Sequence, residues 1–162
     1  MQRLRMTLVT IYDDEKILLG MKKRGFGVGK WNGFGGKVKD GEDLFSAAQR
    51  ELLEECGVQL QTNDALKKRG VIDFIFEDKP DEVLEVNFFS IHADMIVGEP
   101  LETEEMKPQW FAHDDIPYAS MWVDDPHWLP LLLDGKNFVG TFLFSANGDQ
   151  ILEKKLQTLE NI

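Results

Sequence analysis

Short apolar runs separated by polar turns occupy most of the chain, and they predict strands. The runs cover residues 4–12, 16–22, 70–77, 83–94, 107–111, 138–144 and 150–155. The pair Asp13 and Asp14, the acidic stretch 78–81 and the dipeptide Asn147-Gly148 lie between neighbouring runs. Asn-Gly is a strong hairpin signal, so we expect the last two runs to form a closing hairpin.

Two other segments carry helix signals. Residues 44–56 follow Asp43, a good N-cap residue, and precede Gly57, a typical helix end. At about 100° per residue, one stripe of this segment is apolar and is expected to pack on a core. The stripe consists of Phe45, Ala48, Leu52 and Cys56. A second helix is predicted over residues 126–133, with Asp125 as N-cap and Pro126 in the first helical position.

Strands mixed with two helices predict an α+β fold. The chain has 162 residues, 43% of them hydrophobic and 29% charged, without repeats or linkers, so we expect a single domain over residues 1–162. No apolar run approaches the ~20 residues of a membrane helix, and residues 1–7 lack a secretory signal. The single Cys56 fits a reducing compartment. We therefore expect a soluble cytoplasmic protein, with mitochondria or the nucleus as alternatives.

The net charge of −11 narrows the choice of partners. Binding to DNA or RNA polymers requires a basic face, so a nucleic-acid polymer is not expected as a partner. A small anionic substrate remains compatible with the acidic composition, because bound divalent cations can invert the local field.

Three glutamates in the first helix indicate a metal site. Glu51, Glu54 and Glu55 are spaced i, i+3 and i+4, so their carboxylates share one face beside the apolar stripe. Like charges crowded against a core repel each other unless a cation neutralises them. Hard oxygen ligands select Mg²⁺, with Mn²⁺ as an alternative. A solvated acidic helix end paired with Arg50 is the simpler explanation if the three glutamates are taken alone.

The sequence around these glutamates favours the metal site. Residues 36–58 contain seven fixed positions at a set spacing. They are Gly36, Glu42, Arg50, Glu51, Glu54, Glu55 and Gly57, with Leu52 and Val58 in apolar positions. With ~6% usage for each fixed residue, a chance match at a given start is on the order of one in a billion. This segment resembles the Nudix box of Nudix hydrolases without a mismatch.

The resemblance extends over nearly the whole chain and is to the eukaryotic MutT homologues, which hydrolyse oxidised purine nucleoside triphosphates. It rests on residues 20–38, 104–111, 121–125 and 128–133. The resemblance implies an αβα sandwich with a mixed central sheet, and Mg²⁺-dependent hydrolysis of a nucleoside triphosphate to monophosphate and pyrophosphate. It implies a small-molecule nucleotide substrate and a monomer.

The resemblance also implies roles for individual residues. The metal ligands would be Gly35 through its carbonyl, Glu51, Glu54, Glu55 and Glu105. Glu55 would take the proton of the attacking water or orient it, and Arg50 would hold a carboxylate of the box. The substrate contacts would be Thr7, Lys22, Phe26, Asn32, Phe34, Gly35, Gly36, Lys37, Phe74, Trp122, Val123, Asp124, Asp125 and Trp128.

These roles agree with general chemistry at several positions. Aromatic side chains can stack on a purine, and an amide such as Asn32 can bond its edge. Asp124 and Asp125 are adjacent carboxylates, and in an apolar pocket one of them should hold a proton near neutral pH. Ordinary core packing is an equal alternative for Phe74 and Trp128.

Two departures from the family pattern concern base preference. The turn at 78–82 is one residue longer than expected, and Leu84 lies near an expected methionine. Val123 replaces a proline beside the two aspartates. A Nudix hydrolase for another substrate, such as a methylated purine nucleotide or a dinucleoside polyphosphate, therefore remains open. A binding module without catalysis would be expected to lose acids of the box, and none is lost.

Overall fold

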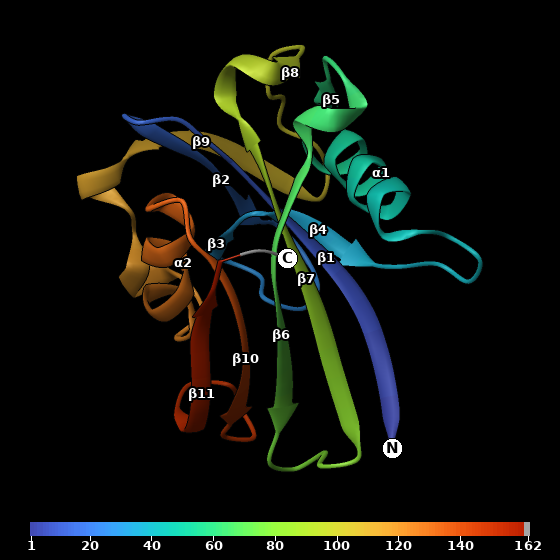
Figure 1. The fold of residues 1–162 in the computed structure, drawn as a ribbon, viewed down its shortest axis with the longest axis vertical. Coiled ribbons are helices and arrows are strands. Elements are labelled where there is room, and N and C mark those ends of the chain that lie inside the picture. Colours follow the sequence, from blue (N-terminus) through green and yellow to red (C-terminus); the bar gives the residue numbers. More distant parts are fainter. Residues whose placement is uncertain (161–162) are drawn as a thin grey trace.

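A computed structural model describes residues 1–160, and its centre is a nine-stranded sheet (Figure 1). The strands run in the order β11-β10-β6-β7-β1-β2-β3, with β4 paired to β1 and β9 paired to β2. Their bounds are β1 Gln2–Tyr12, β2 Lys16–Lys22, β3 Trp31–Asn32, β4 Phe34–Lys37, β6 Lys67–Phe76, β7 Glu82–His92, β9 Met106–Ala112, β10 Asn137–Phe144 and β11 Ile151–Leu159. The β1–β7 and β6–β10 pairs are parallel and the other pairs antiparallel. The predicted α+β class with a mixed sheet is confirmed.

The two α-helices lie on opposite sides of the sheet (Figure 1). Helix α1 (Leu44–Cys56) covers a core that contains Val9 and Phe89, whereas α2 (Asp125–Leu133) covers a core that contains Phe88 and Phe142. Residues 88 and 89 are neighbours on β7, so their side chains point to opposite faces. This arrangement gives the αβα layers.

Helix α1 has the predicted ends. The Asp43 carboxylate accepts a hydrogen bond from the backbone N–H of Ser46 at 2.8 Å, which satisfies one free donor of the first turn. At the other end Gly57 has φ of 74° and donates to the Leu53 carbonyl at 2.9 Å.

The apolar stripe of α1 is buried except at its first member. Ala48, Leu52 and Cys56 are at most 1% exposed, whereas Phe45 is 44% exposed. The Phe45 ring meets Phe89 edge-on, with ring centroids 5.1 Å apart, and leaves its other side to solvent. The prediction of a fully packed Phe45 is therefore wrong, because only one edge of the ring reaches the core.

Helix α2 begins one residue earlier than predicted. Asp124 occupies the cap position, and neither aspartate caps the helix with its side chain. The prediction of Asp125 as N-cap is wrong because both carboxylates turn into the protein, where Asp124 accepts a hydrogen bond from Trp128 Nε1 at 2.8 Å. Pro126 lies in the first turn, as predicted.

The glycine-rich run before α1 contains strands β3 and β4, which the sequence analysis did not predict. Thr7 of β1 is opposite Gly36 of β4, and Leu8 is opposite Gly35. A side chain on Gly35 would overlap the Thr7 carbonyl oxygen, so the pairing requires glycine there. A small second sheet, β5 (Gln59–Leu60) with β8 (Ile96–Val97), was also not predicted.

Four 3₁₀ turns connect these elements. They are η1 Asn63–Ala65, η2 Ala93–Met95, η3 His113–Asp115 and η4 Tyr118–Ser120. The predicted closing hairpin around Asn147-Gly148 is present as β10 and β11, and β11 extends further than predicted, to Leu159. Within residues 1–160, no helix has both the length and the hydropathy needed to span a membrane.

Candidate active site

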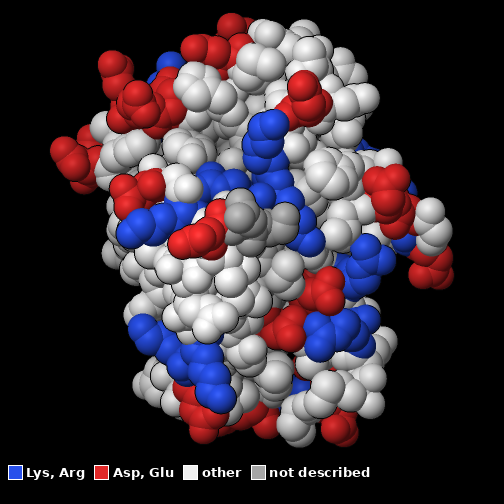
Figure 2. Space-filling model, in the orientation of Figure 1, with Lys and Arg blue, Asp and Glu red and all other residues white. Residues whose placement is uncertain are grey.

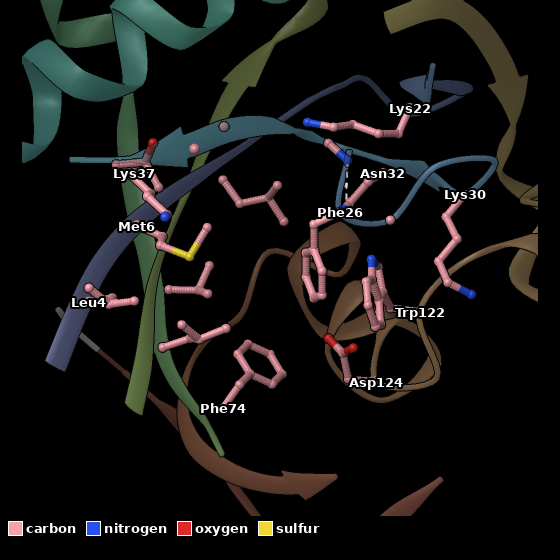
Figure 3. Close-up of a pocket in the computed structure, with 18 of the residues that line it drawn as sticks. Leu4, Met6, Lys22, Phe26, Lys30, Asn32, Lys37, Phe74, Trp122 and Asp124 are labelled. Atoms are coloured by element: carbon pink, nitrogen blue, oxygen red, sulfur yellow. Dashed lines mark hydrogen bonds between the residues drawn. The ribbon is translucent and has the colours of Figure 1, made fainter. Parts of the chain in front are cut away.

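A cavity of about 790 Å³ opens between the sheet and α2 and extends to the acidic face of α1 (Figure 3). Carboxylates of α1 and two lysines line one end, and aromatic side chains with two aspartates line the other. The polar end contains Lys22, Lys37, Glu51, Glu54, Glu55 and Glu105. The aromatic end contains Phe26, Asn32, Phe74, Phe76, Trp122, Asp124, Asp125 and Trp128.

Glu55 is the most buried acid at the polar end, with 3% of the residue exposed. Its carboxylate accepts a hydrogen bond from the backbone N–H of Gly35 at 2.7 Å. Burial raises the pKa of Glu55 to about 8, and the charges of Glu51 and Glu105 add to this rise. Lys22 and the Gly35 N–H oppose the rise without cancelling it.

Glu51 lies directly against the backbone of β4. A Cβ built on Gly36 would stand 2.6 Å from Glu51 Oε1, so only glycine leaves room for the carboxylate. This contact explains why a glycine is needed fifteen positions before the glutamate, at the start of the box.

Arg50 holds the carboxylates of the box together. Its guanidinium bonds Glu42 twice, at 2.8 and 3.0 Å, and donates to Glu51 at 2.8 Å and to the Lys37 carbonyl at 3.0 Å. A weaker contact reaches Glu54 at 3.3 Å. The bond from Arg50 lowers the pKa of Glu42 to about 2, with help from the backbone N–H of Lys39. Such bidentate pairs orient side chains as well as stabilising charge.

Glu105 stands just before β9 and faces the cavity. Arg24 donates to its carboxylate through Nε at 3.0 Å and through Nη2, which lowers the pKa of Glu105. Both this acid and the exposed Glu54 are thus paired with arginines, whereas no arginine contact is formed by Glu55 in the part of the chain that the structure describes.

The oxygens at the polar end suit a hard divalent cation. With the side chains as placed, residues 1–160 contain no group of three or more His, Cys, Asp or Glu residues already set to hold a metal ion. The donor set nevertheless fits, because Glu51, Glu54, Glu55 and Glu105 line one end of one cavity. Glu55 is also buried beside two like charges, whose repulsion a cation would relieve.

At the opposite end, Asn32, Phe26 and Trp122 lie around one space (Figure 3). The Asn32 Oδ1 atom accepts a hydrogen bond from the Gly33 N–H at 2.9 Å. This bond fixes the amide, and its NH₂ group remains as a donor. The Phe26 and Trp122 ring centroids are 5.0 Å apart, and Lys30 Nζ lies 5.2 Å from the Trp122 ring.

Asp124 and Asp125 form the floor of this end, and they are 5% and 2% exposed. Burial raises the pKa of Asp124 to about 6, partly opposed by its bond from Trp128 Nε1. Burial and the neighbouring Asp124 raise the pKa of Asp125 well above its usual range. Asp125 Oδ2 has no hydrogen-bond partner among the described residues. The pair can therefore hold a proton near neutral pH, and one oxygen is free for a ligand.

The structure brings most of the predicted residues to the cavity. Those that line it are Thr7, Lys22, Phe26, Asn32, Gly35, Gly36, Lys37, Glu51, Glu54, Glu55, Phe74, Glu105, Trp122, Asp124, Asp125 and Trp128. Phe74 and Trp128 also belong to the core beneath α2, so both alternatives for them hold. Arg50 stands outside the cavity, behind the carboxylates that it holds.

Phe34 and Val123 are corrections to the predicted substrate contacts. Neither lines the cavity. The Phe34 side chain is fully buried in the core beneath α1, since residues 34 and 35 point to opposite faces of β4. Val123 packs against the core beneath α2.

An apolar wall was missed by the sequence analysis, apart from Leu84, which lies near an expected methionine of the pocket wall. Met6 and Leu8 of β1 face the cavity together with Leu84 and Val86 of β7. Because β1 and β7 pair in parallel, with Met6 opposite Val86, alternate residues of both strands share one face. The two-residue period was readable from the sequence, but the pairing of these two strands was not.

Comparison with known proteins agrees with this geometry. Residues 1–132 match the family described as NUDIX domain. The chain belongs to the Nudix family. It is 50% identical to the oxidized purine nucleoside triphosphate hydrolase of mouse (Mus musculus), over 96% of this chain and 95% of the relative. It is also 50% identical to the protein of the same name from zebrafish (Danio rerio), over 97% and 96% of the two chains.

Solved structures of other Nudix proteins share the fold. A mutator MutT protein from Bacillus halodurans superposes with a TM-score of 0.80 over 95% of this chain and 97% of that chain, at 24% identity. A MutT NUDIX hydrolase from Burkholderia pseudomallei has a TM-score of 0.62 and 31% identity, over 74% of this chain and 94% of that chain. Nudix hydrolases generally need a divalent metal ion, which agrees with the oxygen-rich end of the cavity.

Proposed function

We propose that this Nudix protein hydrolyses oxidised purine nucleoside triphosphates to the monophosphate and pyrophosphate, with Mg²⁺ as cofactor, and so removes damaged purines from the nucleotide pool. The mouse and zebrafish relatives are both named oxidized purine nucleoside triphosphate hydrolase, which supports this class of substrate. Within the class we expect 8-oxo-dGTP and 2-hydroxy-dATP. The observation that carries the proposal is the two-ended cavity. Its aromatic end suits a purine and its acidic end suits metal-bound phosphates.

The base would stack against Trp122 with its edge toward Asp124 and Asp125. Stacking on an aromatic ring tolerates any base, so discrimination depends on the edge. Of two coupled carboxyls, the protonated one donates and the ionised one accepts. The pair can therefore meet a purine carbonyl and the adjacent ring N–H, while the Asn32 NH₂ group donates to a further acceptor.

The triphosphate would extend toward Lys22, Lys37 and the α1 carboxylates. The cation would be held by Glu51, Glu54, Glu55, Glu105 and the Gly35 carbonyl. When bound, Mg²⁺ neutralises phosphate charge and acidifies water. Glu55 would orient the attacking water or take its proton, a role suited to an acid whose pKa is raised to about 8. Arg50 would keep Glu51 turned toward the cavity.

The domain extent, oligomeric state and cellular location of the protein are part of the same proposal. We expect one Nudix domain over residues 1–162, acting as a cytoplasmic monomer, with mitochondrial or nuclear pools as alternatives. Size-exclusion chromatography with light scattering tests the monomer directly.

A turnover panel tests the proposed function. Normal and oxidised purine nucleoside triphosphates are incubated with the protein and Mg²⁺, and the products are identified by chromatography. We expect the oxidised substrates to be preferred, with monophosphate and pyrophosphate as products. Preference for a methylated purine nucleotide or a dinucleoside polyphosphate would replace the proposed substrate. If the protein binds nucleotides but hydrolyses no member of the panel, its function is that of a binding module and not of an enzyme.

A further inference from the structure

Two loops that are far apart in sequence meet on the Trp122 side chain. One loop, residues 23–30, joins β2 to β3 and carries Gly27. The other, residues 145–150, is the turn of the β10–β11 hairpin and carries Gly148. Both glycines face the indole, although 121 positions separate them in the sequence.

The two approaches are at opposite ends of the ring system. A Cβ on Gly27 would stand 3.4 Å from Trp122 Nε1 and 3.5 Å from Cζ2. A Cβ on Gly148 would stand 2.9 Å from Trp122 Cζ3, closer than side-chain carbons tolerate. Trp122 could therefore not keep its place if residue 148 carried a side chain. A Cβ on residue 27 would lie in van der Waals contact with the indole.

The backbone of both positions also requires glycine. Gly27 has φ of 83° and Gly148 has φ of 77°, a region that L side chains rarely adopt. Four other glycines share this backbone conformation without a neighbour that a Cβ would meet within 4 Å. They are Gly25 at φ 79°, Gly29 at φ 84°, Gly41 at φ 78° and Gly135 at φ 78°. The contact with Trp122, not the φ angle alone, therefore distinguishes Gly27 and Gly148.

Other aromatic rings complete the enclosure. The Phe76 ring meets Phe26 at 6.4 Å and Phe144 at 5.4 Å, in both cases edge to face. A Cβ on Gly148 would stand 3.3 Å from Phe76 as well, so the hairpin turn supports two members of the group. The group has little room to rearrange on its Gly148 side.

We propose that Gly27 and Gly148 are positioning residues that clamp the Trp122 indole between the two loops and so set the affinity of the cavity for a flat base. The proposal rests on the proposed function, since it assumes that Trp122 stacks on the substrate base. The clamp orients the ring and takes no part in phosphate cleavage. Loss of the clamp should therefore weaken ground-state and transition-state binding equally, which raises KM and leaves kcat unchanged.

The first experiment observes the indole itself and needs no substrate. The protein is labelled with 5-fluorotryptophan, and the ¹⁹F resonance of Trp122 is assigned with Trp122→Phe. Gly148→Ala should shift or broaden this resonance and leave those of Trp31, Trp110 and Trp128 in place. Gly135→Ala is the matched control, because it has the same backbone conformation without a contact, and it should leave the Trp122 resonance unchanged.

A second pair of variants tests the other loop. Gly27→Leu should disturb the Trp122 resonance, because its Cβ would already touch the indole and the longer side chain adds bulk at that contact. Gly29→Leu carries the same strain in the same loop with open space around it, and it should have no such effect. Equal disturbance by both variants would mean that loop strain alone acts, and it would overturn the clamp. This pair carries the test if Gly148→Ala does not fold.

Kinetics then connect the ring to the base. With an oxidised purine triphosphate, we expect Gly148→Ala and Gly27→Leu to raise KM about tenfold and to keep kcat within twofold, while Gly135→Ala and Gly29→Leu change neither. In a Trp122→Phe background the smaller ring lacks the Cζ3 atom of the indole. Gly148→Ala should therefore raise KM by a smaller factor in that background than in the wild type. The proposal would be overturned if the effects of Trp122→Phe and Gly148→Ala on KM were fully additive. A fall in kcat at constant KM would overturn it as well.

The two proposals fail in different ways. If the wild type turns over no oxidised purine, the proposed function fails, but the ¹⁹F spectra still report whether the glycines hold Trp122. If turnover is normal and the Trp122 resonance ignores Gly148→Ala and Gly27→Leu, only the clamp fails.

Discussion

The α1 end of the cavity holds four carboxylates and the α2 end holds two, and the groups that surround these carboxylates differ between the two ends. At the α1 end, Arg50 pairs with Glu42 and Glu51, and Arg24 pairs with Glu105. These arginines lower the pKa values of Glu42 and Glu105. At the α2 end, Asp124 and Asp125 are buried against aromatic rings with a single indole N–H as donor, and their pKa values are raised. Figure 2 shows acidic and basic side chains interspersed over the face of the molecule that it draws.

The difference follows from what each end has to bind. Phosphates carry their own charge, and a cation bridges them to ionised oxygens, so proton-free carboxylates are needed there. A purine edge is neutral and presents donors and acceptors side by side, so a carboxyl that keeps a proton is useful. Glu55 shares features with both groups of carboxylates, because it is buried like the two aspartates but lies among the candidate metal ligands.

Removing charge at the α1 end should have the largest effect. We expect Glu54→Gln and Glu55→Gln each to lower kcat by roughly a thousandfold or more, since several kcal/mol of transition-state stabilisation depend on the metal site. Both changes keep the side-chain shape, and circular dichroism should show an intact fold. Glu153→Gln on β11, far from the cavity, is the control and should keep full activity. Turnover that persists unchanged in EDTA would contradict the metal site.

At the α2 end, Asp124→Asn should change selectivity more than rate. Asparagine fixes one donor and one acceptor, whereas the aspartate pair can exchange a proton and present either pattern. We expect kcat/KM for an oxidised guanine and an oxidised adenine substrate to fall unequally. Their ratio should change roughly tenfold or more, as an unpaired buried polar group costs 1–3 kcal/mol. If both values stay within about twofold of the wild type, the proton exchange does not operate.

The same pair should make stability depend on pH. The pKa of Asp124 is raised from 3.8 to about 6, so the folded protein retains a proton that the unfolded chain has lost above pH 4. This contribution to the free energy of unfolding is complete below pH 4 and disappears as the pH rises through 6. Its size is about 3 kcal/mol, from 1.36 kcal/mol per pKa unit.

Urea unfolding from pH 4 to pH 8 measures this contribution. The decline should be smaller in Asp124→Asn than in the wild type, because the substituted side chain does not titrate. Identical pH profiles for the two proteins would show that Asp124 ionises normally in the folded state.

Local signals predicted α1 and the hairpin at Asn147-Gly148 correctly, because their ends depend on neighbouring residues. The start of α2 was predicted wrongly for a reason that is not local. Asp125 has the composition of an N-cap, but burial against Trp128 and the cavity directs both carboxylates inward. A local sequence pattern does not show whether an aspartate side chain will cap a helix or be buried in the tertiary structure.

The candidate site also contains residues that local sequence patterns predicted and residues whose position depends on contacts between distant segments. The box residues were readable because their spacing places three carboxylates on one helix face, whereas the wall formed by Met6 and Val86 depends on the parallel pairing of distant strands. The exclusion of Phe34 depends on which face of β4 points to the cavity. The clamp on Trp122 requires two loops whose proximity no local pattern indicates.

The smallest effect that we expect is a difference in melting temperature between Glu55→Gln and Glu54→Gln when no metal is bound. Glu55 is buried among like charges, whereas the Glu54 side chain is 52% exposed and lies 3.3 Å from Arg50. In EDTA at pH 8, Glu55→Gln removes a partly charged buried group, and its amide oxygen can still accept from the Gly35 N–H. The melting temperature should rise by a few degrees, since about 1 kcal/mol shifts it by 2–4 °C in a chain of this size. Glu54→Gln should change it by less than one degree, because an exposed ion pair contributes little. Differential scanning calorimetry decides the order of the two variants. A fall for Glu55→Gln would mean that the Glu55 carboxylate, through its bond from the Gly35 N–H of β4, stabilises the fold more than its burial and repulsion destabilise it.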